Sequence, residues 1–452
     1  MRFFIIFTKH KLLLPQMDKS EREKIIKLIR REVIPAIGCT EPMAVALCVA
    51  KATEILEKRP EQITVFLSAN ILKNAMGVGI PGTGMIGLPI AIALGALIGK
   101  SEYQLEVLKD CTPSDVKQGQ KIIDSKSIQI YLKENISEKL YIEAFCKSGE
   151  NSSSAIISGT HTNFVYLQKD NKILLDKQYS NHLPTEDEIV SLNLKKVYEF
   201  ATTAPIEEIR FILESAQLNK TAAEQSFKGN FGHGLGKILT GKFENEVMGK
   251  SIFSHILSFT SAACDARMAG AMIPVMSNSG SGNQGIAATL PVVIYAEDNK
   301  LPEEQLIRAL TLSHLTVIYI KQSLGYLSAL CGCVVAATGS SCGITYLMGG
   351  DYSKITYAVK NMIANLTGMI CDGAKPSCAL KLTSGVSTAI LSALLAIENK
   401  CVSSVEGIID EDVDKSIHNL TQIGSQGMEE TVHPISPDTG ELRSTRQMRR
   451  GG

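Results

Sequence analysis

A change of residue pattern in the first half of the chain limits the folds that it can adopt. Between residues 127 and 175, short runs of β-branched and apolar residues are separated by charged, Gly or Asn turns, whereas Asp187–Lys415 has the pattern of long helices joined by Gly/Ser loops. The short runs are Ile128–Leu132, Leu140–Cys146, Ser154–Gly159 and Asn163–Leu167. Charged residues on one side of each run indicate a sheet with one solvated face. The sequence therefore predicts an α+β fold, in which a predominantly helical domain carries a small inserted antiparallel β-sheet subdomain.

The same change of pattern gives the expected domain boundaries. We expect the helical domain to consist of residues 17–125 and 184–428, with the β subdomain inserted at 126–183. Within the first part, the expected elements are helices at Ser20–Val33, Met43–Leu56 and 88–99 and a strand at Gln62–Ser68. We expect residues 1–16 to be a non-core extension and the polar residues 429–452 to be a disordered tail.

The charge balance argues against some classes of partner. The chain has 46 basic and 46 acidic residues, so nothing predicts binding to nucleic acid or to an anionic membrane. Two uncharged stretches, Gly77–Gly99 and Gln322–Gly350, are long enough to span a bilayer. Both are rich in Gly, Ser and Thr and lack aromatic or Lys/Arg-biased flanks, so we expect buried helices and tight loops, with a membrane carrier as an alternative. The Gly- and Ala-rich helices are compatible with a homodimer.

The cysteines point to a metal site. They are eleven in number and irregularly spaced, which predicts a reducing, cytoplasmic location rather than a secreted disulfide framework. Four of them form two close pairs, Cys331-Gly-Cys333 and Cys371-x6-Cys378. Thiolates gathered in this way are typical ligands of a soft metal or an iron–sulfur cluster, and a cluster held by three of them leaves one iron free to bind substrate. Free buried thiols and structural zinc are the alternatives, although the second spacing fits no ordinary zinc knuckle.

Candidates for proton transfer lie on a loop before the second helix. Cys39, Thr40 and Glu41 supply a thiol, a hydroxyl and a carboxylate there, and the N-terminus of a helix favours a thiolate or a bound carboxylate. Such residues could act as a base or as a substrate anchor, whereas a capping turn with an incidental cysteine is the alternative. The eight histidines show no metal-ligand spacing, and we interpret His233 and His314 as structural.

Two further Gly-rich segments could bind an anion. Ser277–Gly285 alternates Gly with short polar side chains, a pattern that can form a backbone nest for a carboxylate. It lacks the lysine of a phosphate-binding loop and is no dinucleotide fingerprint. The loop Gly77–Gly84, with Lys73 and Asn74 just before it, is similarly suggestive and equally unspecific.

Five segments of the chain resemble the L-cysteine desulfidase family, which is related to the alpha chain of iron–sulfur L-serine dehydratases. They are AIGCTEP at 36–42, KNAMGVGIPGTG at 73–84, SNSGSGNQGI at 277–286, LSALCGCVVAATG at 327–339 and NLTGMICDGAKPSCALK at 365–381. The resemblance covers about residues 17–428. It implies a cytoplasmic [4Fe–4S] lyase that needs no pyridoxal phosphate and converts L-cysteine and water to pyruvate, ammonia and hydrogen sulfide.

The resemblance also implies roles for particular residues. Cys371 and Cys378 would be cluster ligands, and the third would come from the first cysteine pair, where the distance to the following Gly349-Gly350 favours Cys331 over Cys333. The dehydratases carry a Ser-Ser-His-Thr segment where this chain has Gly38-Cys39-Thr40, so Cys39 is expected to replace their histidine base. The expected substrate-binding residues are Thr40, Glu41, Lys73, Asn74, Ser279, Gly280, Ser281, Gly282 and Asn283. An L-serine dehydratase and a non-catalytic metal-binding scaffold remain as alternative functions.

Overall fold

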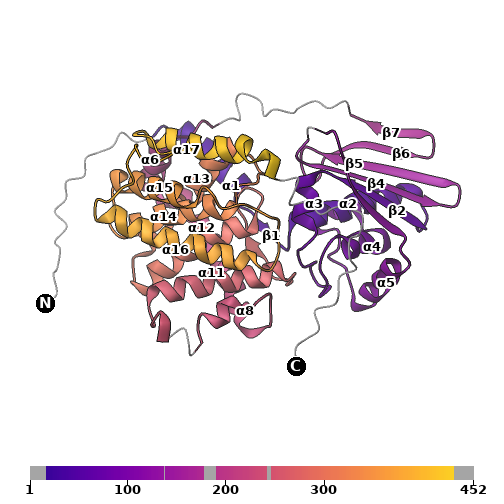
Figure 1. Cartoon of the computed structure of the whole chain (residues 1–452), viewed down its shortest axis with the longest axis horizontal. Coiled ribbons are helices and arrows are strands. Elements are labelled where there is room, and N and C mark those ends of the chain that lie inside the picture. The colour runs from indigo at the N-terminus through magenta and orange to yellow at the C-terminus, as the bar shows by residue number, and fades with distance from the viewer. Residues whose placement is uncertain (1–16, 137, 178–189, 242–245, 432–452) are drawn as a thin grey trace.

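The computed structural model describes residues 17–136, 138–177, 190–241 and 246–431, and the predicted extension at 1–16 and the tail from residue 432 lie outside them. The described residues fold around two hydrophobic cores that lie side by side (Figure 1). One core belongs to a helical body and the other to a unit that combines helices with a sheet. The predicted α+β class is confirmed, and helices form most of the molecule.

The helical body begins with α1 (Lys19–Glu32), which is capped by the side chain of Asp18, and continues after the sheet. Its other helices are α6 (Leu194–Thr203), α7 (Ile206–Ile209), α8 (Leu213–Lys228), α9 (Leu235–Ile238), α11 (Ile252–Met268), α12 (Gly282–Asp298), α13 (Glu303–Leu324), α14 (Gly332–Leu347), α15 (Tyr352–Leu366), α16 (Cys378–Ile397) and α17 (Val413–Gln422).

Helix α14 lies inside this body, where it contacts α12, α13, α15 and α16. Residues 333–345 of α14 are all buried. Small residues permit this packing, since a Cβ atom on Gly339 would lie only 2.5 Å from the carbonyl oxygen of Ser313 on α13. Much of the uncharged stretch Gln322–Gly350 is therefore a buried helix, as predicted. By length and composition, one helix in the described ranges, α16, could cross a membrane, and it packs against α11, α14 and α15.

The second unit is a six-stranded mixed sheet with helices packed on one face. The strands are β2 (Gln62–Leu67), β3 (Ile128–Leu132), β4 (Tyr141–Ser148), β5 (Asn151–Ser158), β6 (Phe164–Lys169) and β7 (Lys172–Asp176), in the order β3-β2-β4-β5-β6-β7. The helices are α2 (Thr40–Leu56), α3 (Ala69–Ala75), α4 (Leu88–Ile98) and α5 (Pro113–Asp124). Alternate residues of β2, Ile63, Val65 and Leu67, are buried in the core of this unit, while Phe145 on β4 is partly exposed.

The sheet is larger than the sequence predicts. Strand β2 is an interior strand next to the edge strand β3, paired in parallel with β3 and antiparallel with β4, so the sheet is mixed rather than wholly antiparallel. A parallel pair needs a long crossover, and here α3, α4 and α5 lie between the two strands in sequence. The expected boundary at residue 126 therefore falls inside this unit, whose core extends from Met43 to Ile157.

Three backbone contacts bring distant loops together. Strands β1 (Pro35–Ala36) and β8 (Val275–Met276) pair antiparallel, which places the segments that follow them close to each other. A bridge between Leu330 and Ile370 does the same for the two cysteine pairs. The N–H of Gly79 donates to the carbonyl of Met268 at 2.9 Å, and so ties the second unit to the end of α11.

Candidate active site

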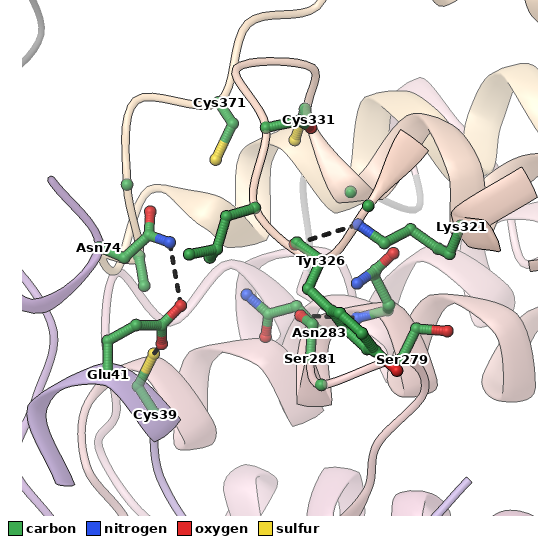
Figure 2. A pocket seen from close by; sticks show the side chains of 18 of the residues that line it. Cys39, Glu41, Asn74, Ser279, Ser281, Asn283, Lys321, Tyr326, Cys331 and Cys371 are labelled. Atoms are coloured by element: carbon green, nitrogen blue, oxygen red, sulfur yellow. Dashed lines mark hydrogen bonds between the residues drawn. The ribbon is translucent and has the colours of Figure 1, made fainter. Parts of the chain in front are cut away.

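A cavity of about 650 Å³ is lined by both units. The sheet-containing unit contributes Glu41 at the start of α2, Asn74 on α3 and the turn between β5 and β6. The helical body contributes the segment before α12, the ends of α11 and α13, and both cysteine pairs. Figure 2 shows Cys39, Glu41 and Asn74 together on one side of the cavity, with Cys331 and Cys371 next to each other on another.

Most of the residues expected to form a site line this single cavity. They are Cys39, Glu41, Asn74, Ser279, Gly280, Ser281, Asn283, Cys331, Cys371 and Cys378, and Cys333 lines it as well. Thr40, Lys73 and Gly282 are not among the lining residues. Thr40 is the first residue of α2, and Gly282 is the first residue of α12. Lys73 is buried, and its ammonium group donates to the carbonyls of Ser328 at 3.3 Å and Cys371 at 3.2 Å.

Cys39 is the N-cap residue of α2, and its side chain is 4% exposed. Its Sγ donates to Oε2 of Glu41 at 3.0 Å, while Nδ2 of Asn74 donates to Oε1 of the same carboxylate at 2.9 Å (Figure 2). Burial, and then the charge of Glu41, raise the pKa of Cys39 well above its ordinary value. The helix N-terminus alone would favour a thiolate, but here the neighbouring carboxylate and the loss of water outweigh it. The thiol is therefore protonated in this arrangement.

His161 lines the cavity although sequence reasoning did not select it. It lies in the turn between β5 and β6, and its Nε2 is buried without a hydrogen-bond partner among the described residues. Burial lowers the pKa of His161, and the charge of nearby Glu41 acts in the opposite direction. Burial acts to raise the pKa of Glu41, but the charge of His161 and the hydrogen bonds from Cys39 and Asn74 outweigh it, so that this pKa is lowered. A short turn motif, Gly159-Thr-His-Thr162, was the only sequence signal available.

The two histidines that the sequence singled out do not line the cavity. His314 is fully buried and bonds Asn278 through Nδ1 at 3.0 Å and Thr289 through Nε2 at 3.0 Å. Burial lowers its pKa to about 3. Through its two hydrogen bonds, His314 holds in place the backbone segment that precedes α12, and its role is therefore structural.

The cysteine pairs differ in how their thiols are placed. The thiols of Cys331 and Cys371 lie next to each other (Figure 2), and their interaction lowers the pKa of Cys371 and raises that of Cys331. The charges of Lys73 and Lys381 also act to lower the pKa of Cys371. Cys378 begins α16, with its Sγ 3.6 Å from the carbonyl oxygen of Gly373.

The thiol of Cys333 does not join the thiols of Cys331 and Cys371 but has a different partner. Its Sγ donates to the carbonyl of Lys381 at 3.1 Å, and a Cβ atom on Gly385 would lie 2.3 Å from it. Cys333 is thus packed between α14 and α16, whereas the thiol of Cys331 meets that of Cys371.

The chemistry of these thiols suits an iron–sulfur cluster. Within the described ranges, no three His, Cys, Asp or Glu side chains are gathered closely enough to hold a single metal ion. A cluster is larger than one ion and needs thiolates spread around a cavity, which is how Cys331, Cys371 and Cys378 are arranged. The cations of Lys73 and Lys381 beside them offset negative charge on thiolate ligands.

The serine dehydratase alpha chain family matches residues 102–435. The chain belongs to this family. It is similar to the UPF0597 protein BF3560 of Bacteroides fragilis, with 73% identity over 92% of this chain and 97% of the relative. A UPF0597 protein of Phocaeicola vulgatus is 74% identical over 91% of this chain and 96% of the relative. A more distant UPF0597 protein, PBPRB0240 of Photobacterium profundum, is 42% identical over 90% of this chain and 95% of the relative.

Membership in the serine dehydratase alpha chain family supports a lyase of the serine dehydratase type. The matched residues include His161 and all four paired cysteines, whereas Cys39, Glu41 and Asn74 precede them. The part of the cavity that would hold a cluster thus lies within the matched residues, and the thiol–carboxylate pair lies in the segment before them.

Proposed function

We propose that this chain is an iron–sulfur lyase that eliminates hydrogen sulfide from L-cysteine, giving pyruvate, ammonia and sulfide. One observation carries the proposal: a thiol paired with a carboxylate, Cys39 with Glu41, lines the same cavity as Cys331, Cys371 and Cys378. One group of residues can move a proton, and the other has the donors of a cluster. An elimination needs both, at opposite ends of a small substrate.

Cys331, Cys371 and Cys378 would hold the cluster. A [4Fe–4S] cluster with three protein ligands supplies a Lewis-acidic iron for the departing sulfur. Lys73 stabilises the loop that carries Cys371, because its ammonium group donates a hydrogen bond to the carbonyl of that residue. Gly373 lies against the same lysine, since a Cβ atom there would be 2.0 Å from the carbonyl oxygen of Lys73.

The side chains on the other side of the cavity would move the proton. Glu41 accepts the Sγ proton of Cys39 in the same step in which this sulfur takes the Cα proton of the substrate, so that no separate thiolate stands beside the carboxylate. Asn74 holds Glu41 in place through its hydrogen bond. His161, with a free Nε2 near Glu41, receives the proton from the carboxylate and so returns Glu41 to the form that can accept again. The aminoacrylate product then tautomerises and hydrolyses.

The segment before α12 would bind the other polar groups of the substrate. Ser279 and Gly280 have positive φ values of 46° and 78°, and the N–H groups of Ser279 and Ser281 donate to the carbonyls of Glu32 and Asn278. Ser281 caps α12, so the first N–H groups of this helix would supply the partial positive charge for an anionic group. Asn283, the second residue of α12, lines the cavity. Thr40 and Gly282, at the first positions of α2 and α12, shape the backbone rather than face the substrate.

L-Cysteine and L-serine should be compared as substrates, because the family that matches the chain is described by its serine dehydratases. With protein prepared and assayed without oxygen, we expect L-cysteine to give sulfide and pyruvate in equal amounts and to outcompete L-serine. The measurement is sulfide and pyruvate release from a mixture of the two amino acids. Pyruvate formation from serine without sulfide from cysteine would establish the dehydratase instead. Protein with one zinc per chain and no turnover of either would establish the scaffold.

The pH dependence of the activity should show whether His161 accepts a proton during the reaction. We expect activity to fall as the pH decreases through the pKa of His161, because the protonated imidazole can no longer accept a proton, and burial places this pKa below its ordinary value. His161→Gln should lower kcat/KM at neutral pH by about 100-fold and remove this acidic limb from the profile. His418→Gln, on the exposed face of α17, is the matched control and should leave the profile unchanged. An unaltered acidic limb in His161→Gln would assign the proton route to Cys39 and Glu41 alone.

A further inference from the structure

Arg267, in the last turn of α11, is a buried cation without a side-chain partner among the described residues. Its side chain is 4% exposed, and its Nε has no hydrogen-bond acceptor in the described part of the chain. No Asp or Glu among the described residues forms an ion pair with it, yet it lines the cavity. Burial of an unpaired guanidinium is costly, so such a group in a cavity indicates an anionic ligand.

The lysines that line the same cavity differ from Arg267 in this respect. Lys321 donates to the carbonyl of Tyr326 at 3.1 Å, and Lys139 donates to that of Ser425 at 3.4 Å. Lys381 is paired with Asp372 and also donates to the carbonyl of Ile370 at 2.8 Å. Each already has an oxygen acceptor from the chain. Among the described lysine and arginine residues of the lining, Arg267 alone has no side-chain hydrogen-bond acceptor from the described part of the chain.

Arg267 lies directly against the N-terminus of α12. A Cβ atom on Gly282 would be 2.2 Å from its Nε, so glycine at the first position of α12 is what lets the guanidinium approach the helix. The first N–H groups of a helix point at an anion and carry partial positive charge. The guanidinium of Arg267 and the first N–H groups of α12 therefore lie close together, and both are positively polarised hydrogen-bond donors.

An unpaired acceptor lies on the same turn of α12. Oε1 of Gln284, whose side chain is 4% exposed, has no hydrogen-bond partner among the described residues and lines the cavity. A buried cation and a buried acceptor that both lack partners are complementary to a ligand with one negative and one positive group.

The position of Arg267 relative to the other groups fits this ligand. Its charge acts to lower the pKa of both Cys39 and Cys378, so it lies near each of them. A carboxylate bound at Arg267 would therefore lie in the same cavity as the thiols of Cys39 and Cys378.

We propose that Arg267 and the N-terminus of α12 bind the α-carboxylate of the substrate, and that Oε1 of Gln284 accepts from its α-ammonium group. The site then selects a free α-amino acid over an amine or a peptide. This inference rests on the proposed lyase function, but equilibrium binding tests it without any turnover.

Two small thiols separate the two ends of the ligand. 3-Mercaptopropionate has the thiol and the carboxylate without the ammonium group, and cysteamine has the thiol and the ammonium group without the carboxylate. With the anaerobic holoprotein and titration calorimetry, we expect Arg267→Met to weaken 3-mercaptopropionate binding by about 100-fold and cysteamine binding by less than about threefold. Gln284→Leu should show the opposite preference. Arg267→Lys, which keeps the charge but loses the planar fork, should be intermediate.

The matched control is Arg210→Met, the same substitution at a residue with a 49% exposed side chain paired with Glu303, and it should change neither affinity. Equal affinity of Arg267→Met and the wild type for 3-mercaptopropionate would overturn the proposal. So would loss of visible absorbance in Arg267→Met and Arg267→Lys, because Arg267 would then be a counter-charge for the thiolates. Arg267-dependent binding in a protein that never releases sulfide would refute the proposed lyase and leave the carboxylate site standing.

Discussion

Replacement of Cys39 by alanine is expected to abolish sulfide release from L-cysteine while the protein keeps its visible absorbance. In the proposed reaction the sulfur of Cys39 takes the Cα proton while its own proton passes to Glu41, and general-base removal lowers a rate by about 10²- to 10⁴-fold. The iron content should not change, because Cys39 lies with Glu41 and Asn74 and not with the cysteine pairs. The measurements are sulfide release, iron per chain and the absorbance spectrum, all made without oxygen.

Cys48→Ala is the matched control for this experiment. Cys48 is a fully buried thiol on the same helix, α2, and it donates to the carbonyl of Ala155 at 3.2 Å inside the second core, away from the cavity lining. Its loss should leave the reaction intact. If Cys39→Ala instead loses its iron, Cys39 is a cluster ligand and the assignment of a base fails. If it keeps both iron and activity, the Cα proton goes to another group.

The sequence could identify this loop but could not give the charge of its thiol. The residue types Cys39 and Glu41 and the following helix were all readable, and the position of Cys39 at a helix N-terminus predicted a thiolate. The folded chain adds burial and places the carboxylate of Glu41 3.0 Å from the thiol. Both disfavour a second negative charge, and their sum decides the protonation state.

His161 and Arg267 were beyond the reach of sequence reasoning for a different reason. Neither lies in a motif with chemical spacing. The role of His161 depends on Glu41, which is more than a hundred residues away, and that of Arg267 depends on the cavity that it lines. His161 approaches Glu41 because β5 and β6 form the same sheet that carries α2. Arg267 is recognisable only because nothing in the described part of the chain pairs with it.

The sheet also shows that sequence patterns predict contacts between neighbouring segments better than contacts between distant ones. The alternating pattern of Gln62–Ser68 predicted a strand correctly, but its place in the sheet depends on partners on both sides. A parallel pairing with β3 follows a crossover through three helices, and a local pattern carries no signal for that. The antiparallel strands from β4 to β7 are joined by short turns, so their neighbours in sequence are also their neighbours in space. The sequence predicted β4, β5 and β6 of this part, whereas β7 (Lys172–Asp176) was not predicted.

The second large effect concerns the third cluster ligand, which is either Cys331 or Cys333. We expect Cys331→Ser, Cys371→Ser and Cys378→Ser each to lose iron and activity together, because a cluster with three protein ligands does not tolerate the loss of one thiolate. Cys333→Ser should keep its iron. The measurements are iron and acid-labile sulfide per chain, with the visible spectrum and sulfide release from L-cysteine.

Cys333→Ser is a demanding control, because Cys333 lies only two residues from Cys331 and lines the same cavity. Sequence spacing could hardly separate the two thiols, but their surroundings do. Cys331 begins the turn that the bridge between Leu330 and Ile370 holds beside Cys371, so its thiol meets that of the second pair. Cys333 is one helical step further into α14, where the side chain turns towards α16 and bonds the carbonyl of Lys381. If Cys333→Ser lost the iron and Cys331→Ser retained it, the loop would have to rotate on cluster binding, and the third ligand would be Cys333.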